Sequence, residues 1–79
     1  MQKMYVTTLE GHVFTISRDK EADNCWSCVF PSTWIQYIQD AKMYTDEYEI
    51  LANSDIAYYC GSLERLMVLI TSYILDSEV

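Results

Sequence analysis

The N-terminal residues carry the clearest structural pattern in the sequence, and this pattern restricts the rest of the fold. Residues 4–9 and 12–17 are rich in β-branched and aromatic side chains and flank Glu10-Gly11. Glycine adopts positive φ readily, so the pattern predicts a β-hairpin with a two-residue loop. The side chains expected on the core face come in facing pairs: Leu9 and His12, Thr7 and Phe14, and Tyr5 and Ile16.

A hairpin by itself is only marginally stable in water, so this one requires another strand and a covering layer of helices. Residues 25–30 alternate in character and place Trp26, Cys28 and Phe30 on one face of a third strand. Pro31, the only proline of the chain, ends this strand. The first part of the chain is therefore expected to form a three-stranded antiparallel sheet.

The chain after Pro31 shows helical spacing. Ser32 or Thr33 can cap a helix that ends near Met43. A second, short helix is expected over residues 46–52, where acidic residues in the first turn suit the helix dipole.

The C-terminal part predicts one long helix over residues 55–75, because its apolar residues recur at alternating spacings of four and three. These residues are Ile56, Cys60, Leu63, Met67, Ile70 and Ile74. Two alternatives stay open. The helix can instead break at Gly61-Ser62, with Ser62 as a fresh cap, and residues 48–51 can pair with residues 56–60 as a second hairpin.

Together these patterns predict a single α+β domain over residues 1–79. A small antiparallel sheet over residues 1–30, the N-terminal hairpin plus a third strand, is expected to pack against a helical half. That half, over residues 32–76, would hold two or three helices, the last of them long.

Charge is the strongest signal in the composition. The chain has 12 acidic and 5 basic residues, and its net charge is −7. Residues 43–79 contain Arg65 as their one basic residue against seven acidic ones, a net charge of −6. Direct binding to nucleic acid is disfavoured, because phosphate contacts need lysine and arginine.

No assembled catalytic group is visible, so we expect no enzyme activity. Cys25 and Cys28 form a CxxC pair, but on a strand they would lie on opposite faces. With Cys60 and His12 they complete a Cys₃His set, which suits structural zinc. The set lacks the two close ligand pairs of zinc ribbons, so we expect buried free thiols and no cofactor, with a small zinc module as an alternative.

Acidic and tyrosine residues are concentrated in residues 43–55, and this segment is the expected partner-binding site. The expected charged contacts are Asp46, Glu47, Glu49 and Asp55, and the expected aromatic anchors are Tyr44 and Tyr48. On a helix, carboxylates three or four residues apart have Cβ atoms about 5–6 Å apart. Successive phosphates along a nucleic-acid strand are separated by about 6–7 Å, so such a helix imitates their spacing.

The expected function is therefore that of an acidic inhibitor, which blocks a basic, nucleic-acid-binding surface on a partner protein. In size, acidity and lack of catalytic groups the chain resembles the small inhibitors encoded by phages and mobile elements. The anti-CRISPR proteins that mimic DNA are among them, and antirestriction proteins and antitoxins share these features. The resemblance implies a viral protein acting in the host cytoplasm.

The alternative function is assembly through the C-terminal helix. Val68 and Leu75 fall outside its main apolar stripe and would provide a second face for a homodimer. The N-terminus lacks the apolar run of a signal peptide, and the longest uncharged stretch, residues 66–75, is too short to span a membrane. We therefore expect a soluble cytoplasmic protein.

Overall fold

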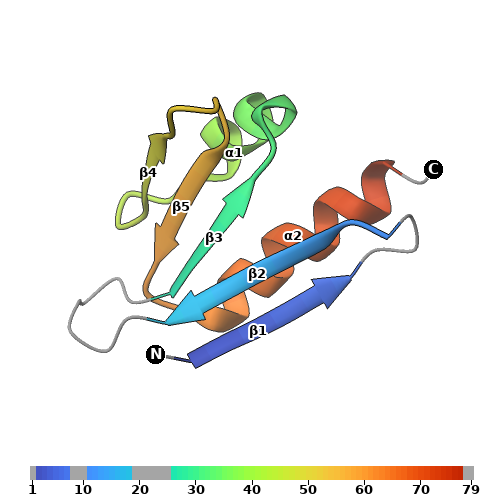
Figure 1. Cartoon of the computed structure of the whole chain (residues 1–79). Coiled ribbons are helices and arrows are strands. Elements are labelled where there is room, and N and C mark those ends of the chain that lie inside the picture. The colour runs from blue at the N-terminus through green and yellow to red at the C-terminus, as the bar shows by residue number, and fades with distance from the viewer. Residues whose placement is uncertain (1, 8–10, 19–25, 78–79) are drawn as a thin grey trace.

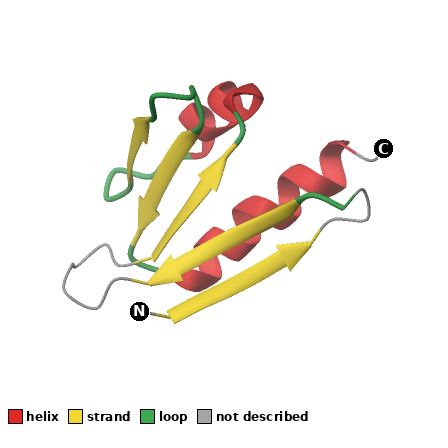
Figure 2. Cartoon of the chain, in the orientation of Figure 1, coloured by secondary structure: helices red, strands yellow, loops and turns green. Residues whose placement is uncertain are grey.

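A computed structural model describes residues 2–7, 11–18 and 26–77. These residues form an α+β fold, in which an antiparallel sheet of five strands has the order β1-β2-β3-β5-β4. The strands are β1 (Gln2–Thr7), β2 (Val13–Arg18), β3 (Trp26–Phe30), β4 (Glu47–Ile50) and β5 (Ile56–Cys60). A 3-10 turn (Ser32–Trp34) leads into α1 (Ile35–Ala41), and α2 (Leu63–Ser77) ends the described chain. Both helices lie on the same side of the sheet (Figures 1 and 2).

The N-terminal hairpin is confirmed, but its register differs from the expected one by one residue. Val6 lies opposite Phe14, and Thr7 lies opposite Val13, so the connection spans residues 8–12. Gly11 has the positive φ, 88°, that the turn requires. A one-residue shift turns the other set of side chains toward the core. Val6 therefore packs against the core, whereas Tyr5 is 65% exposed.

Other members of the expected core face also differ. Thr7 is exposed, as is His12, which precedes β2, whereas Phe14 and Ile16 are buried as expected. Leu9 lies outside the described residues. The third strand is confirmed, with Cys28 and Phe30 both buried.

The second half of the chain is not the helical half that its spacing predicts. The expected helix over residues 46–52 is wrong, because residues 47–50 form β4 and pair with β5. The expected long helix from residue 55 is wrong at its start, because residues 56–60 form β5. The hairpin alternative is the one that the structure adopts. Ile56, Tyr58 and Cys60 point to the core at the period of two that a strand requires.

The two strands are joined by a turn with specific polar chemistry. Leu51 N donates to Asp55 O at 2.8 Å, and the Asn53 side chain accepts from Asp55 N at 3.1 Å. Ser54 has φ of 72°, which is uncommon for a residue with a side chain. These contacts close a tight β4–β5 connection.

The C-terminal helix α2 begins after Gly61, as the alternative with a break at Gly61-Ser62 predicts, but the residues before the break form β5 and not a helix. The Ser62 hydroxyl accepts from Arg65 N at 3.3 Å, which is the geometry of an N-cap. Leu66 and Ile70 of this helix are fully buried against the sheet. The helix is therefore shorter at its N-terminal end than expected.

The first helix is shorter than residues 33–43 and starts differently. Trp34 N donates to Pro31 O at 3.0 Å in the 3-10 turn, and no side chain caps either the turn or α1. Trp34 stacks on Phe30 with ring centroids 5.0 Å apart, and Phe14 meets Trp34 edge-on at 5.2 Å. The Tyr37 hydroxyl donates to Leu69 O at 3.0 Å and so joins α1 to α2.

Neither of the helices in the described part of the chain covers the opposite face of the sheet. In Figure 1 both helices lie behind the strands, so this uncovered face points toward the viewer. It carries Tyr5, Val13 and Val29, which are 65%, 51% and 46% exposed. The uncovered face therefore combines apolar side chains with direct access to solvent.

Candidate protein-binding surface

Asp46 does not lie on an outward acidic patch, so the expected role of this residue as a partner contact is corrected. Its side chain is only 2% exposed. Oδ2 accepts hydrogen bonds from the Tyr58 hydroxyl, from Arg65 Nη2 and, at 3.1 Å, from Met43 N. The turn before β4 is therefore joined to β5 and to α2 by a single carboxylate.

The contacts of Asp46 also give a structural role to Arg65, the one basic residue of residues 43–79. Arg65 pairs with Asp46, and its side chain is 35% exposed. Burial, with a smaller contribution from nearby Cys60, raises the pKa of Tyr58 to about 12, so its hydroxyl stays protonated and donates. The cluster neutralises the Asp46 charge internally and serves the fold.

Glu47 and Glu49 are the acidic residues that the fold presents together. They alternate along β4, so both point to the uncovered face, and both are exposed. Glu49 Oε1 accepts from the Tyr59 hydroxyl of β5 at 2.7 Å. This hydrogen bond raises the pKa of Tyr59 above its ordinary value, with partial burial and the charge of Glu49 adding to it. We call Glu47, Glu49 and Tyr59 the acidic edge.

The other expected partner contacts lie elsewhere. Tyr44 is fully exposed in the turn before β4. Tyr48 points to the helix side of the sheet, where it packs against the core and its hydroxyl accepts from Gln39 Nε2 at 3.2 Å. Asp55 is held in the β4–β5 turn by Asn53. The six residues expected to bind a partner therefore do not form one patch.

The structure places five side chains in a row across the uncovered face, and the sequence patterns did not predict this row. The row contains one residue from each strand, in the order Lys3, Ser17, Ser27, Tyr59 and Glu47. Residues directly opposite in antiparallel strands point to the same side, so all five lie on the uncovered face. Finding this row requires the hairpin register together with the pairing of β3, β5 and β4, which no local sequence pattern gives.

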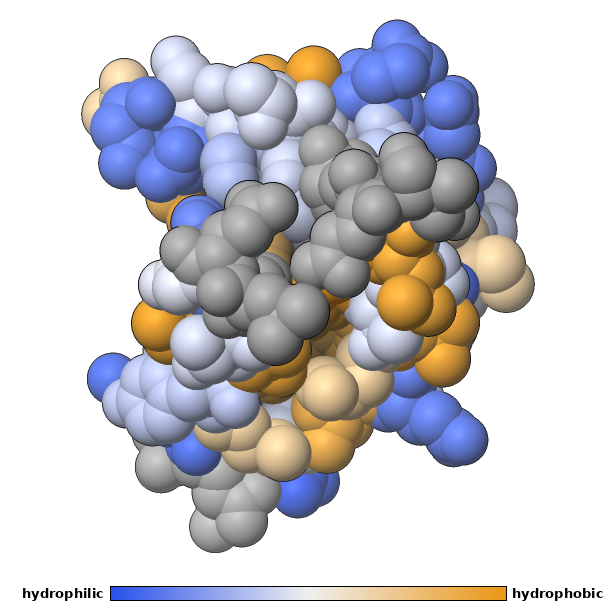
Figure 3. All heavy atoms as spheres, turned by 90° about the vertical axis from the view of Figure 1, so that its right-hand side faces the viewer, coloured by the Kyte–Doolittle hydropathy of each residue, from blue (hydrophilic) through white to orange (hydrophobic). Residues whose placement is uncertain are grey.

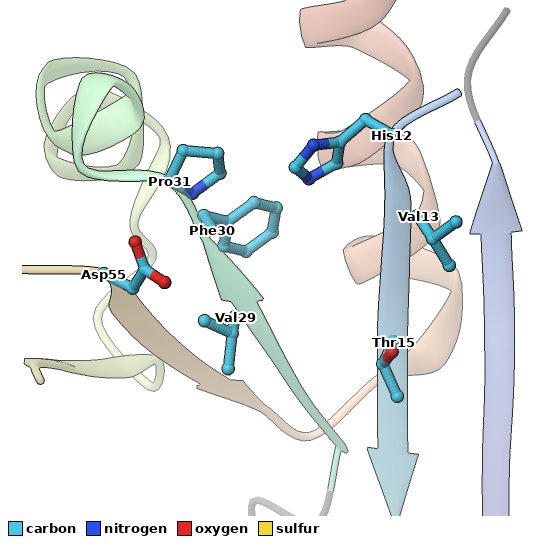
Figure 4. Close-up of a pocket in the computed structure, with 7 residues that line it drawn as sticks. All are labelled: His12, Val13, Thr15, Val29, Phe30, Pro31 and Asp55. Carbon is cyan, nitrogen blue, oxygen red and sulfur yellow. The ribbon is translucent and has the colours of Figure 1, made fainter. Parts of the chain in front are cut away.

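A cleft of about 400 Å³ opens where β2 and β3 diverge. The two strands pair at Ile16–Arg18, and the described part of the ladder does not extend to Val13 or Phe30. Figure 4 shows His12 and Asp55 bordering the cleft from opposite sides. Its lining is mainly apolar and consists of His12, Val13, Thr15, Val29, Phe30, Pro31 and Asp55.

Among the described residues, the cysteines and the histidine considered for zinc do not form one ligand group. Cys28 and Cys60 are buried, and burial raises the pKa of the Cys28 thiol to about 12. His12 lies beside Phe14 at one end of β2, with ring centroids 4.5 Å apart, whereas Cys60 lies next to Trp26 at the other end. Cys25 lies outside the described residues. Within the described chain no group of three or more His, Cys, Asp and Glu side chains is arranged to hold a metal ion.

The residues considered for a helix-mediated dimer reach solvent. Val68 and Leu75 are 59% and 60% exposed. They are seven residues apart in α2, so they lie on the same side of the helix. Figure 3 views the molecule from the right-hand side of Figure 1, the side at which α2 ends, and apolar atoms reach the surface there between hydrophilic ones.

Comparisons with protein-family models, with curated proteins and with solved structures found no match to this chain. Among the described residues, no helix has the length and apolar character needed to cross a membrane.

Proposed function

We propose that the protein is a non-enzymatic inhibitor or adaptor whose acidic edge contacts a basic surface on a partner protein. The observation that carries this proposal is the exposed Glu47–Glu49 pair on one face of β4. No cation of the second half offsets it, because Arg65 pairs with the buried Asp46. An exposed pair of one sign steers a protein toward a surface of the opposite sign.

The partner surface is proposed to be one that also holds nucleic acid. Side chains two residues apart on a strand are separated by roughly 6.6 Å. This spacing matches the distance of about 6–7 Å between successive phosphates. The strand therefore supports the same mimicry that the expected helix would have supported, with two carboxylates in place of four. Tyr59, held by Glu49, adds an aromatic contact of the kind found at binding hot spots.

Charge reversal at the acidic edge is the direct test. We expect Glu47→Lys/Glu49→Lys to lose about tenfold or more of its affinity for the partner, because like charges would then face each other. The measurement is capture of partner proteins from an extract of the cells that make the protein, followed by titration of the captured protein. Added double-stranded DNA should release the partner from the wild-type protein.

The matched control is Asp40→Lys/Glu64→Lys, which makes the same change in net charge. Both residues are exposed, and they belong to α1 and α2, away from the acidic edge. This control is expected to retain the partner. Equal retention by the Glu47→Lys/Glu49→Lys variant would contradict the proposal.

A second candidate is a structural protein that assembles through α2, and the exposure of Val68 and Leu75 supports it. Here we expect Val68→Glu/Leu75→Glu to halve the mass measured by light scattering, because two carboxylates would enter an apolar interface. A dimer whose mass is unchanged by this substitution would exclude α2 as the interface.

A further inference from the structure

The row across the uncovered face has opposite charges at its two ends. Lys3 of β1 and Glu47 of β4 occupy the edge strands, and Ser17, Ser27 and Tyr59 lie between them. Both end residues are exposed. Four strand spacings separate them, roughly 19 Å, so they cannot form an ion pair within one chain.

The centre of the same face carries small or weakly polar side chains. Ser27 and Ala57 have small side chains, and Val29 of β3, which lies directly opposite Ala57 of β5, is 46% exposed. Sheets pack face to face about 10 Å apart when their central side chains are short enough to interdigitate. The uncovered face therefore has the form of one half of a two-sheet sandwich.

We propose that the uncovered face binds a second copy of this chain, face to face, around a two-fold axis that runs parallel to the strands along β3. Such an axis exchanges the two edges of the sheet, so β1 of each copy lies over β4 of the other. Lys3 then faces the partner's Glu47, and the contact occurs twice by symmetry. Ser27 and Val29, which lie on the axis, face their own equivalents.

The charge pairing tolerates the twist of real sheets. Packed sheets are rotated by about 30° relative to each other, which displaces the edge strands along their length by about 5 Å. Glu49 follows Glu47 on the same face at roughly 6.6 Å, so a displacement toward Glu49 leaves Lys3 facing a carboxylate. Tyr5, the next outward residue of β1, would also lie over this acidic edge.

The size of the face predicts a weak dimer. Five strands of about five residues cover roughly 19 by 16 Å, or about 300 Å² in projection. This is well below the 800 Å² or so per partner that stable interfaces bury. The dimer should therefore dissociate on dilution and weaken with added salt. It does not depend on the proposed basic partner, although the two would compete for Glu47 and Glu49.

The test uses the purified chain alone, so its result is independent of partner capture. Sedimentation equilibrium from micromolar to millimolar concentration should show the mass of the wild-type protein rising toward twice that of the monomer. Lys3→Glu and Glu47→Lys should each raise the dissociation constant by about tenfold or more, because each places like charges at both edges. An equimolar mixture of these two variants should form a heterodimer, in which opposite charges meet again at both edges.

The mixture also serves as the folding control, since misfolded variants would not recover association. Lys42→Glu and Glu64→Lys make the same charge changes at exposed positions outside the sheet and are expected to dimerise as the wild type does. A wild-type chain that stays monomeric at millimolar concentration would overturn the inference. So would a dimer that persists in Lys3→Glu but is lost in Val68→Glu/Leu75→Glu.

Discussion

Replacing Arg65 by methionine is expected to destabilise the protein by about 3 kcal/mol, the largest effect of any single side chain outside the apolar core. The substitution keeps most of the side-chain length but leaves the Asp46 carboxylate, 2% exposed, without its cation. An unpaired buried charge is far more costly than the ion pair itself is favourable. The expected loss of stability lies at the lower end of the range usual for breaking a buried ion pair, because Arg65 is one-third exposed. The measurement is urea unfolding at neutral pH.

The double variant Arg65→Met/Asp46→Asn is the control for this effect. Asparagine keeps an oxygen that can accept from Tyr58 and Met43 but carries no charge. The double variant should therefore recover most of the lost stability, which gives a coupling energy between the two positions. If both variants are destabilised equally, the loss comes from packing by Arg65 and not from the buried charge.

Stability is expected to fall steeply as the pH rises from about 9 to about 12. The pKa of Cys28 is raised from 9.0 to about 12 by burial, and that of Tyr58 from 10.0 to about 12. Both groups keep their proton in the folded state and lose it first in the unfolded state. Their contribution is therefore complete below pH 9 and is lost as the pH approaches 12. At about 1.4 kcal/mol per pKa unit, Cys28 alone contributes on the order of 4 kcal/mol.

Urea unfolding under reducing conditions, at several pH values between 7 and 11, measures this slope. Cys28→Ala removes one titrating group, so its stability should depend less on pH above 9, although its stability at pH 7 is lower. Tyr44→Phe is the matched negative control, because Tyr44 is fully exposed. It should leave the slope unchanged, and an equal slope in Cys28→Ala would show that burial of this thiol does not control alkaline unfolding.

The sheet could be predicted where local patterns allow one interpretation. The N-terminal hairpin and the strand before Pro31 were found because alternation and turn chemistry agree there. The register was wrong because the length of the connection was assumed, and residues 8–12 connect the strands instead of residues 10–11. Since side chains alternate with a period of two, this single-residue error exchanged Tyr5 and Val6 between the two faces.

The second half was misread because one spacing fits two structures. Ile56 and Cys60 are four residues apart, which places them on the same face of either a helix or a strand. Tyr58 is fully buried between them, and a residue two positions from each shares their face only in a strand. The burial of Tyr58 in turn depends on its hydrogen bonds with Asp46 and Arg65. Such contacts, 12 and 7 residues away along the chain, are set by tertiary structure and leave no local pattern.

The candidate site was only partly predictable, because part of it also depends on tertiary contacts. Acidic residues near tyrosines were visible in the sequence, and Glu47 and Glu49 do reach solvent. That Asp46 turns inward could not be known without the fold, because a buried carboxylate and an exposed one look alike in a sequence. The relation of Lys3 to Glu47 exists only across five paired strands, so no local sequence pattern indicates it.

The divergence of β2 from β3 makes the sheet mechanically uneven. Among the described residues these strands pair over Ile16–Arg18, whereas β1 pairs with β2 from end to end. Pulling the β1–β2 hairpin away from β3 would break this short β2–β3 pairing before the longer pairing between β3 and β5. Beyond this paired segment, Phe14 of the hairpin packs against the rings of Phe30 and Trp34. A force applied across the molecule is thus resisted by aromatic packing in the region where the described parts of β2 and β3 do not pair.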